Sequence, residues 1–201
     1  MTITLQIDVH GWWQSGSGRG DGKLADSLAH RDADGLPELT GAQVKGLIRS
    51  VLETGIHAGV VEPSEVADWL GSSLPAEGSR DEAVEALEAA RYTSTAGSWA
   101  FTAATLGPDW RRWARSTDGD PNALFSLVAR TRLDAHGVAV DHTLRTIEVV
   151  APMTLTAEIH GPDARGVEAL ETCLPWLRAV GSGRNRGLGR CTVTIRPGGA
   201  Q

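Results

Sequence analysis

Cysteine, aromatic residues other than tryptophan, and long apolar segments are scarce in this sequence. The 201 residues include only two cysteines, Cys173 and Cys191, which are too few for a disulfide framework or a zinc finger. No apolar run approaches the ~18 residues that a membrane-spanning helix needs, so we expect no membrane partner. Residues 1–10 contain neither a basic nor a long apolar stretch, so we expect no signal peptide. These absences favour a reducing, cytoplasmic location.

The net charge of −6 hides an uneven distribution of charge along the chain. Residues 53–90 hold nine acidic residues and one basic residue, whereas the rest of the chain has a net charge of +2. From Arg178 to Arg196 there are five arginines and no acidic residue. A locally basic surface attracts polyanions whatever the total charge. A solvated acidic helix and an arginine-rich composition would give the same pattern.

Hydrophobic periodicity predicts an alternation of strands and helices within one globular domain. Strands are expected at residues 2–9, 98–105, 153–159 and 191–196. One helix should follow Thr40, which forms a capping box with Gln43, and end near Gly55. A second should span residues 167–177, where Pro175 kinks or shortens it. This order predicts an α+β, ferredoxin-like fold.

Three further segments interrupt this pattern. Residues 56–96 are expected to form an acidic, inserted helical lid with short helices at 63–70 and 81–91. Residues 110–113 are expected to lie in a linker. A projecting β-hairpin is expected near residues 130–148, with strands at 127–133 and 138–150 around a turn at 135–137.

Two glycine-rich loops are candidates for binding. The loop at residues 16–23 lacks the residues of a P-loop, and a flexible connector explains it equally well. The second loop, at residues 181–190, contains four glycines and three arginines. Glycines let backbone N–H groups approach phosphates closely, and arginines supply charge and forked donors. A helix end would explain Gly181 alone, so we interpret this loop as a site for RNA or another polyanion.

Side chains that suit catalysis or base stacking are fewer. Four carboxylates follow the first strand: Asp21, Asp26, Asp32 and Asp34. A carboxylate beside a phosphodiester can hold Mg²⁺ or orient a 2′-hydroxyl, but Asp32 and Asp34 belong to an Asp-Ala-Asp-Gly sequence that is typical of a turn. The six histidines show no metal-ligand spacing, so no zinc is expected. Trp99 and Phe101 are expected in the core, and Trp12 and Trp13 fit either core or interface.

Four segments, in this order, carry a resemblance to a known family. They are an acidic loop at residues 26–37, a helix start at 39–49, a hairpin at 130–149 and the glycine-rich loop at 181–189. Together they resemble the RAMP superfamily, in particular the backbone subunit of type III CRISPR effector complexes. Thr40 and Ala42 replace the family's usual proline and serine, and the zinc-binding cysteines of some relatives are missing.

The resemblance implies a subunit that binds guide RNA, assembles with copies of itself into a filament and joins other type III effector subunits. The hairpin would act as a thumb that flips a nucleotide out of the guide–target duplex. Asp26 would be the catalytic residue that cuts target RNA beside that nucleotide, with Mg²⁺ or another divalent cation. The RNA-binding residues would be Lys45, Arg49, His136, Val138, Gly181, Gly183, Arg184, Arg186, Gly187 and Gly189.

Two alternatives remain open at the level of the sequence. One is a non-catalytic RAMP subunit that caps or spaces such a complex. The other is a stand-alone ribonuclease that processes repeat RNA, because such enzymes share the glycine-rich loop, although they often use histidine and lack the Lys45-Gly46 helix start.

Overall fold

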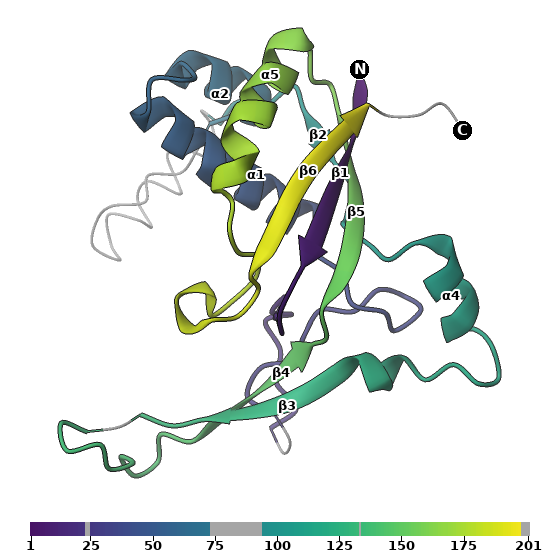
Figure 1. Ribbon diagram of the computed structural model, residues 1–201, viewed down its shortest axis with the longest axis vertical. Coiled ribbons are helices and arrows are strands. Elements are labelled where there is room, and N and C mark those ends of the chain that lie inside the picture. Colours follow the sequence, from purple (N-terminus) through teal and green to yellow (C-terminus); the bar gives the residue numbers. More distant parts are fainter. Residues whose placement is uncertain (23–24, 73–93, 133, 198–201) are drawn as a thin grey trace.

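A four-stranded antiparallel sheet forms the centre of the molecule (Figure 1). The computed structural model describes residues 1–22, 25–72, 94–132 and 134–197. The sheet contains β1 (Thr2–Val9), β2 (Ala100–Phe101), β5 (Met153–His160) and β6 (Cys191–Pro197) in the spatial order β2-β5-β1-β6. Helix α1 (Gly41–His57) lies between β1 and β2 in the chain, and α5 (Ala164–Cys173) lies between β5 and β6. The predicted ferredoxin-like topology is confirmed.

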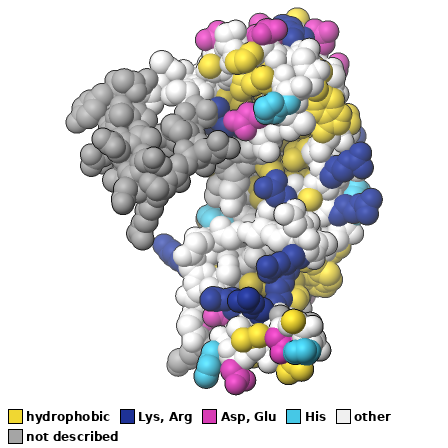
Figure 2. Space-filling model, turned by 90° about the vertical axis from the view of Figure 1, so that its left-hand side faces the viewer, with side chains coloured by type: hydrophobic (Ala, Val, Ile, Leu, Met, Phe, Trp, Pro, Cys, Tyr) yellow, Lys and Arg dark blue, Asp and Glu magenta, His cyan; other side chains and the backbone are white. Residues whose placement is uncertain are grey.

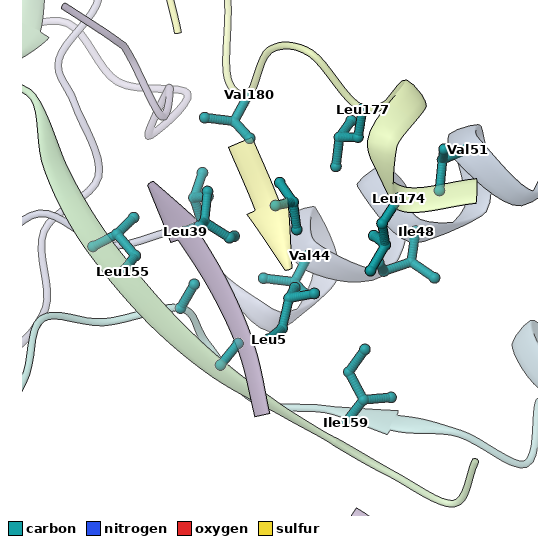
Figure 3. Close-up of a cluster of buried hydrophobic side chains, with 14 of the residues drawn as sticks. Leu5, Leu39, Val44, Ile48, Val51, Leu155, Ile159, Leu174, Leu177 and Val180 are labelled. Carbon is teal, nitrogen blue, oxygen red and sulfur yellow. The ribbon is translucent and has the colours of Figure 1, made fainter. Parts of the chain in front are cut away.

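The core lies between one face of the sheet and the two helices, which pack side by side (Figures 1 and 3). Alternate residues of β1 point into it because side chains on a strand alternate between faces. Figure 3 shows Leu5, Leu155 and Ile159 of the sheet facing Val44 and Ile48 of α1. Fully burying each such side chain stabilises the fold by about 1.5–3 kcal/mol. Among the described residues, no helix is both long and apolar enough to span a membrane.

The ends of both helices follow local rules. Thr40 and Gln43 form the expected capping box at the start of α1. Asp163, which the sequence analysis did not identify, caps α5 by accepting a hydrogen bond from the backbone of Gly166. Helix α5 ends at Cys173 and continues as a 3₁₀ turn, η2 (Leu174–Trp176), so Pro175 shortens the helix as predicted.

A second antiparallel pair, β3 (Phe125–Arg130) and β4 (Arg145–Val150), projects from the sheet (Figure 1). We call residues 125–150 the thumb. The projecting hairpin is present, but its predicted strands at 127–133 and 138–150 are wrong in extent, because the regular ladder stops at the pair Arg130 and Arg145. Beyond it, Asp134 Oδ1 accepts hydrogen bonds from the backbones of His136 and Val138 and closes a separate turn at the tip.

The strand expected at residues 98–105 is also shorter than predicted. Residues 100–101 pair with β5, but Ala104 turns away and exchanges backbone hydrogen bonds with Leu39 at 2.8 and 3.0 Å. Thr105 then returns to bridge Thr156 of β5. By pairing with Leu39, Ala104 satisfies backbone hydrogen-bonding groups of the chain just before α1. The periodicity of the sequence does not reveal this change of partner.

The lid contains α2 (Pro63–Leu70), which matches the first of its two predicted helices. The second predicted helix, at 81–91, lies outside the described residues. The segment expected as a linker is helical instead: α4 (Pro108–Ala114) begins with proline at its first turn, where the missing N–H costs nothing. No residue of α4 is fully buried, although Trp113 and Ala114 pack partly against the core.

Tryptophans divide between the core and the surface. Trp99 is buried and its ring stacks on Trp69 at a centroid distance of 4.9 Å, so its predicted core position is confirmed. Trp13 is fully buried and donates its indole N–H to the carbonyl of Ala151, whereas Trp12 is 45% exposed. The open face of the sheet is dominated by threonines and carries no Trp, Phe or Tyr on its described strands, so it offers no platform for stacking bases.

Candidate nucleic-acid interface

The glycine-rich loop is fixed in place by the segment that follows β1. The backbone N–H of Ser182 donates to the carbonyl of Gln14 at 2.8 Å, and that of Gly189 donates to Trp12 at 2.8 Å. Gly181 and Gly189 both have positive φ, and a Cβ on either would clash with a carbonyl oxygen, that of Gln14 or of Val180. These two glycines therefore serve close backbone packing. The sequence suggested a structural role for Gly181 only, whereas the fold requires glycine at Gly189 as well.

The other two glycines shape the exposed turn of the loop. Gly183 and Gly187 flank the 3₁₀ turn η3 (Arg184–Arg186), and both adopt left-handed φ angles of 71° and 81°. A Cβ on Gly187 would meet no atom within 4 Å. The two residues turn the chain so that both arginines of η3 are exposed, which positions them for contact with an anion.

Two neighbouring grooves separate this loop from α1. The first, here the helix groove, has a volume of about 290 Å³. Its lining comes from the loop after β1, from α1 and from the glycine-rich loop: Gly16, Leu39, Gln43, Gly46, Leu47, Ser50, Gly181, Ser182 and Arg184. The second, here the Trp176 groove, measures about 190 Å³ and shares Ser50 and Arg184 with the first. Both glycine-rich loops thus meet α1, although about 165 residues separate them in the chain.

A larger cleft lies between the same loop and the thumb. This thumb cleft measures about 750 Å³ and is lined by Arg130, Thr131, Arg132, His142, Thr143, Arg145, Ile147 and Arg186. A Cβ on Gly183 would lie 3.3 Å from Arg130 Nη1, so the guanidinium of Arg130 packs directly against the loop. The cleft therefore joins two segments that are far apart in sequence and both rich in arginine.

Among the described residues, no acidic side chain lines any of these three openings. We call their six arginines the basic track: Arg130, Arg132, Arg145, Arg178, Arg184 and Arg186. Within the described part of the chain, none of the six guanidinium groups makes a side-chain hydrogen bond or an ion pair. Figure 2 shows Lys and Arg side chains across the middle of this face, with Asp and Glu above and below them.

Cross-strand pairing in the thumb adds to the positive charge. Arg130 and Arg145 stand directly opposite each other in the β3–β4 ladder. Like charges in this position destabilise a strand pair, by amounts comparable to the 0.2–1 kcal/mol that a favourable pair contributes. A bound anion between them would relieve the repulsion. A phosphate bound between Arg130 and Arg145 would therefore stabilise the thumb.

The two basic residues of α1 lie elsewhere. Arg49 donates through Nη2 to the carbonyls of Leu70 and Gly71, at 2.8 and 2.9 Å, and so caps the C-terminus of α2. At 100° per residue, Lys45 and Arg49 lie on the side of α1 away from the helix groove. The structure therefore brings Arg184 and Arg186 together but does not join Lys45 and Arg49 to them in one strip.

Asp26 lies at the base of the thumb. Its carboxylate Oδ2 accepts a hydrogen bond from the backbone N–H of Thr146 at 2.7 Å, and its own N–H donates to the Thr146 carbonyl at 2.8 Å. Thr146 sits between Arg145 and Ile147, which both line the thumb cleft. Asp26 is exposed and held beside the cleft at a defined position. Asp21 is part of a nearby turn, where it accepts from the backbone N–H of Ala25.

The remaining predicted residues have simpler surroundings. His136 and Val138 are exposed at the tip of the thumb, and Val138 is 61% exposed. Asp32 Oδ1 accepts from the backbones of Asp34 and Leu36, so its predicted turn role is confirmed. Among the described residues, no group of three or more His, Cys, Asp or Glu side chains could hold a metal ion.

Other arginines are committed to carboxylates. Arg31 pairs with the buried Glu148 at 2.8 Å. Arg115 forms two hydrogen bonds with Asp34, which hold the pKa of that carboxyl below its usual value. Arg165 does the same for Glu65 and lowers its pKa. Unlike the arginines of the basic track, these three have their charge compensated within the fold.

Four members of the basic track were not named as binding residues from the sequence: Arg130, Arg132, Arg145 and Arg178. Arg130 and Arg132 are two residues apart in a predicted strand, and this spacing places both side chains on the same face. Arg145 could be added only once the register of the hairpin was known. Arg178 belonged to the arginine-rich stretch, but nothing in the sequence placed it in a groove.

Comparison with known proteins extends the description of the fold. No family model and no curated protein matches the sequence. Among solved structures, a chain of the type III-B Cmr-β complex bound to cognate target RNA matches with a TM-score of 0.65, at 12% identity over 97% of both chains. A chain of apo Cmr-β gives 0.63, also at 12% identity over 97% of both chains.

A chain of a type IV-B CRISPR complex matches with a TM-score of 0.57 at 16% identity, over 100% of this protein and 92% of that chain. In all three cases the match spans nearly the whole chain. The protein therefore shares its fold with subunits of type III-B and type IV-B CRISPR complexes.

Proposed function

We propose that the protein is the guide-RNA-binding backbone subunit of a type III CRISPR effector complex, in which it binds RNA through the basic track. The observation that supports this proposal is the set of six arginines around the glycine-rich loop, which have no charged partner and line openings without an acidic side chain, as far as the described residues go. The full-length likeness to a chain of a complex bound to cognate target RNA supports it as well. Copies of the chain would line up along the guide, and other effector subunits would complete the complex.

The proposed contacts are with the RNA backbone. Arginines bind phosphates through two parallel hydrogen bonds, and these contacts position RNA without reading its sequence. Specificity would come from base pairing between guide and target. His136 and Val138, exposed at the tip of the thumb, would contact the RNA where a nucleotide is displaced from the duplex.

A charge reversal in the loop tests the binding proposal. Arg186→Glu should weaken binding of unrelated guide sequences equally and lower the slope of log affinity against log salt by about 1–2, since each phosphate contact contributes roughly 0.7–0.9. Affinity would be measured at several salt concentrations. Arg112→Glu is a matched control, because Arg112 is exposed on α4 and lies outside the track. An unchanged affinity and slope for Arg186→Glu would contradict the proposal.

Cleavage of target RNA is the second part of the proposal, with Asp26 as the catalytic residue. The 2′-hydroxyl beside the displaced nucleotide would attack the adjacent phosphorus, and the bond to the 5′-oxygen would break. Asp26 would orient the hydroxyl and accept its proton, while water protonates the leaving oxygen. The neighbouring Arg145 would offset the charge that develops on the phosphate. Alignment of the displaced nucleotide contributes much of the rate.

A divalent cation belongs to this proposal. Mg²⁺ is often held by one or two carboxylates together with phosphate oxygens of the substrate. Asp26 would supply the protein ligand, and the RNA and water would supply the others. The described residues contain no group of three or more His, Cys, Asp or Glu side chains that could hold an ion without these further ligands.

Substitution of Asp26 separates cleavage from binding. Asp26→Ala should abolish cutting of target RNA in the assembled complex while guide affinity stays within about twofold, because no arginine of the track changes. Asp21→Ala is the control and should still cut. Cleavage at regular spacing would be followed in the presence of Mg²⁺. Full cleavage by the Asp26→Ala complex would refute the assignment.

One observation favours a non-catalytic backbone subunit instead. An oxygen of the Asp26 carboxylate is already bound to the backbone of Thr146, and no second carboxylate or histidine completes a metal-binding group among the described residues. In that case the unmutated complex would bind guide and target RNA with the same salt dependence but leave the target intact. The cleavage assay above distinguishes the two functions.

A further inference from the structure

The Trp176 groove combines an exposed aromatic ring with free positive charge. Trp176 is 40% exposed, although tryptophan is among the side chains most often buried for much of its surface. Arg178, Arg184 and Asn185 line the same groove, and Ser50 and Thr54 of α1 form its other side. A flat ring can stack on the exposed tryptophan, and an anionic group can bind the two arginines, which have no partner among the described residues. A ligand that is both flat and anionic therefore suits this groove.

The local fold holds Trp176 outward and restricts its backbone. In a 3₁₀ turn, residues three apart lie on the same side. Leu174 and Leu177 are three apart and both buried, at 2% and 8% exposure, so Trp176 must face away from the core. The ring of Pro175, the residue before Trp176, fixes the φ angle of Pro175. The ring is therefore presented on a rigid support that would lose little freedom when a ligand binds.

We infer that Trp176 is a stacking platform for one base of a single-stranded segment of RNA. Bases of single strands stack on aromatic side chains while arginines hold the phosphates on either side. Arg184 lines both this groove and the helix groove, so the strand would continue from one to the other. This inference rests on the proposed binding of RNA and adds a base contact to contacts that otherwise involve only phosphates.

RNA fits this groove better than a protein partner does. Tryptophan and arginine are enriched at protein interfaces too. The groove, however, has no acidic side chain among the described residues of its lining, and it shares Ser50 and Arg184 with the helix groove. A polyanion matches the positive charge of both grooves. A protein that docked on Trp176 would leave the affinity for RNA independent of this side chain.

The experiment compares two oligomers of equal length, a single-stranded RNA of about 12 nucleotides and a sugar-phosphate oligomer without bases. Trp176→Ala should lower the affinity of the full chain for the RNA by about tenfold, because one stacked base is lost. It should not change the affinity for the oligomer without bases, and the salt slope should stay the same. Trp176→Phe should restore most of the affinity, since phenylalanine also stacks.

Trp110→Ala is the matched control, because Trp110 is 41% exposed but lies on α4, outside the track. It should bind both oligomers like the unmutated chain. Equal losses on both oligomers, or no loss on the RNA, would overturn the inference. If Arg186→Glu loses affinity while Trp176→Ala does not, only this inference fails. If the unmutated chain binds neither oligomer, the proposed function fails with it.

Discussion

The arginines of two groups of segments are used in opposite ways. Around the lid and α4, Arg49, Arg115 and Arg165 each donate to carbonyls or carboxylates of the fold. Around the glycine-rich loop and the thumb, the six arginines of the basic track have no such partner among the described residues. Arginine content alone therefore says little about nucleic-acid binding. An arginine without a partner among the described residues is available to an anion, whereas an arginine paired within the fold is not.

The comparison is tested most strongly at the pair Arg130 and Arg145. Arg145→Glu should reduce RNA affinity by at least about tenfold and lower the salt slope by about 1–2, because a phosphate contact is lost and a repulsive charge is gained. The same change places opposite charges across the strand pair. It should therefore raise the free energy of unfolding without RNA, by up to about 1 kcal/mol.

Binding titrations and denaturant unfolding on the same preparation measure the two effects. Arg145→Gln is the control, since it removes the like-charge repulsion without adding a negative charge, and its effects on both quantities should be smaller. A variant that loses stability together with affinity would show that Arg145 supports the thumb rather than binding phosphate.

Arg49 represents the opposite class. Arg49→Met should lower the free energy of unfolding by about 1–3 kcal/mol, because two charge-assisted hydrogen bonds to the end of α2 are lost. For a chain of this size that corresponds to a fall in Tm of about 2–10 °C. The salt slope of RNA binding should not change.

Lys45→Met serves as the comparison, since Lys45 lies one turn earlier on the same side of α1. It should cost less stability than Arg49→Met. If Arg49→Met instead lowers the salt slope as Arg186→Glu does, then Arg49 holds phosphate, as the family resemblance implies, and the division of the arginines is wrong at this position.

The sequence was sufficient for the order of the elements and for the capping of α1, because both depend on patterns within about ten residues. It was insufficient for the ends of the thumb ladder, where a turn held by Asp134 replaces strand pairing. It also missed α4, since a helix of seven residues is too short for an apolar period to stand out.

The candidate site was predictable only in part, for a related reason. The glycine-rich loop is a local motif, so Arg184 and Arg186 could be named from it. Whether an arginine is free depends on distant partners. Arg31 meets Glu148, 117 residues away, and Arg115 meets Asp34, 81 residues away. Such pairing has no trace in local spacing, and neither does the approach of Arg130 to Gly183.

The smallest effect is expected at the pair of Arg115 and Asp34. Arg115 keeps the pKa of Asp34 below its usual value through their two hydrogen bonds. A carboxyl with a lowered pKa in the folded state stabilises the protein above the unfolded pKa of about 4, and that contribution disappears as pH falls through the folded value. Stability that depends on this pair should therefore be present at neutral pH and lost in acid.

Arg115→Ala should accordingly lower Tm slightly at about pH 7, and the difference from the unmutated chain should vanish in acid, as the pH falls through the lowered pKa of Asp34. Thermal unfolding at neutral and acidic pH measures it. Arg112→Ala is the control, because Arg112 and Asp109 are both largely exposed, and exposed pairs contribute little to stability. RNA affinity should be the same for both variants, since neither arginine belongs to the basic track. A Tm difference for Arg115→Ala that persists in acid would mean that Arg115 stabilises the fold by packing and not by its charge.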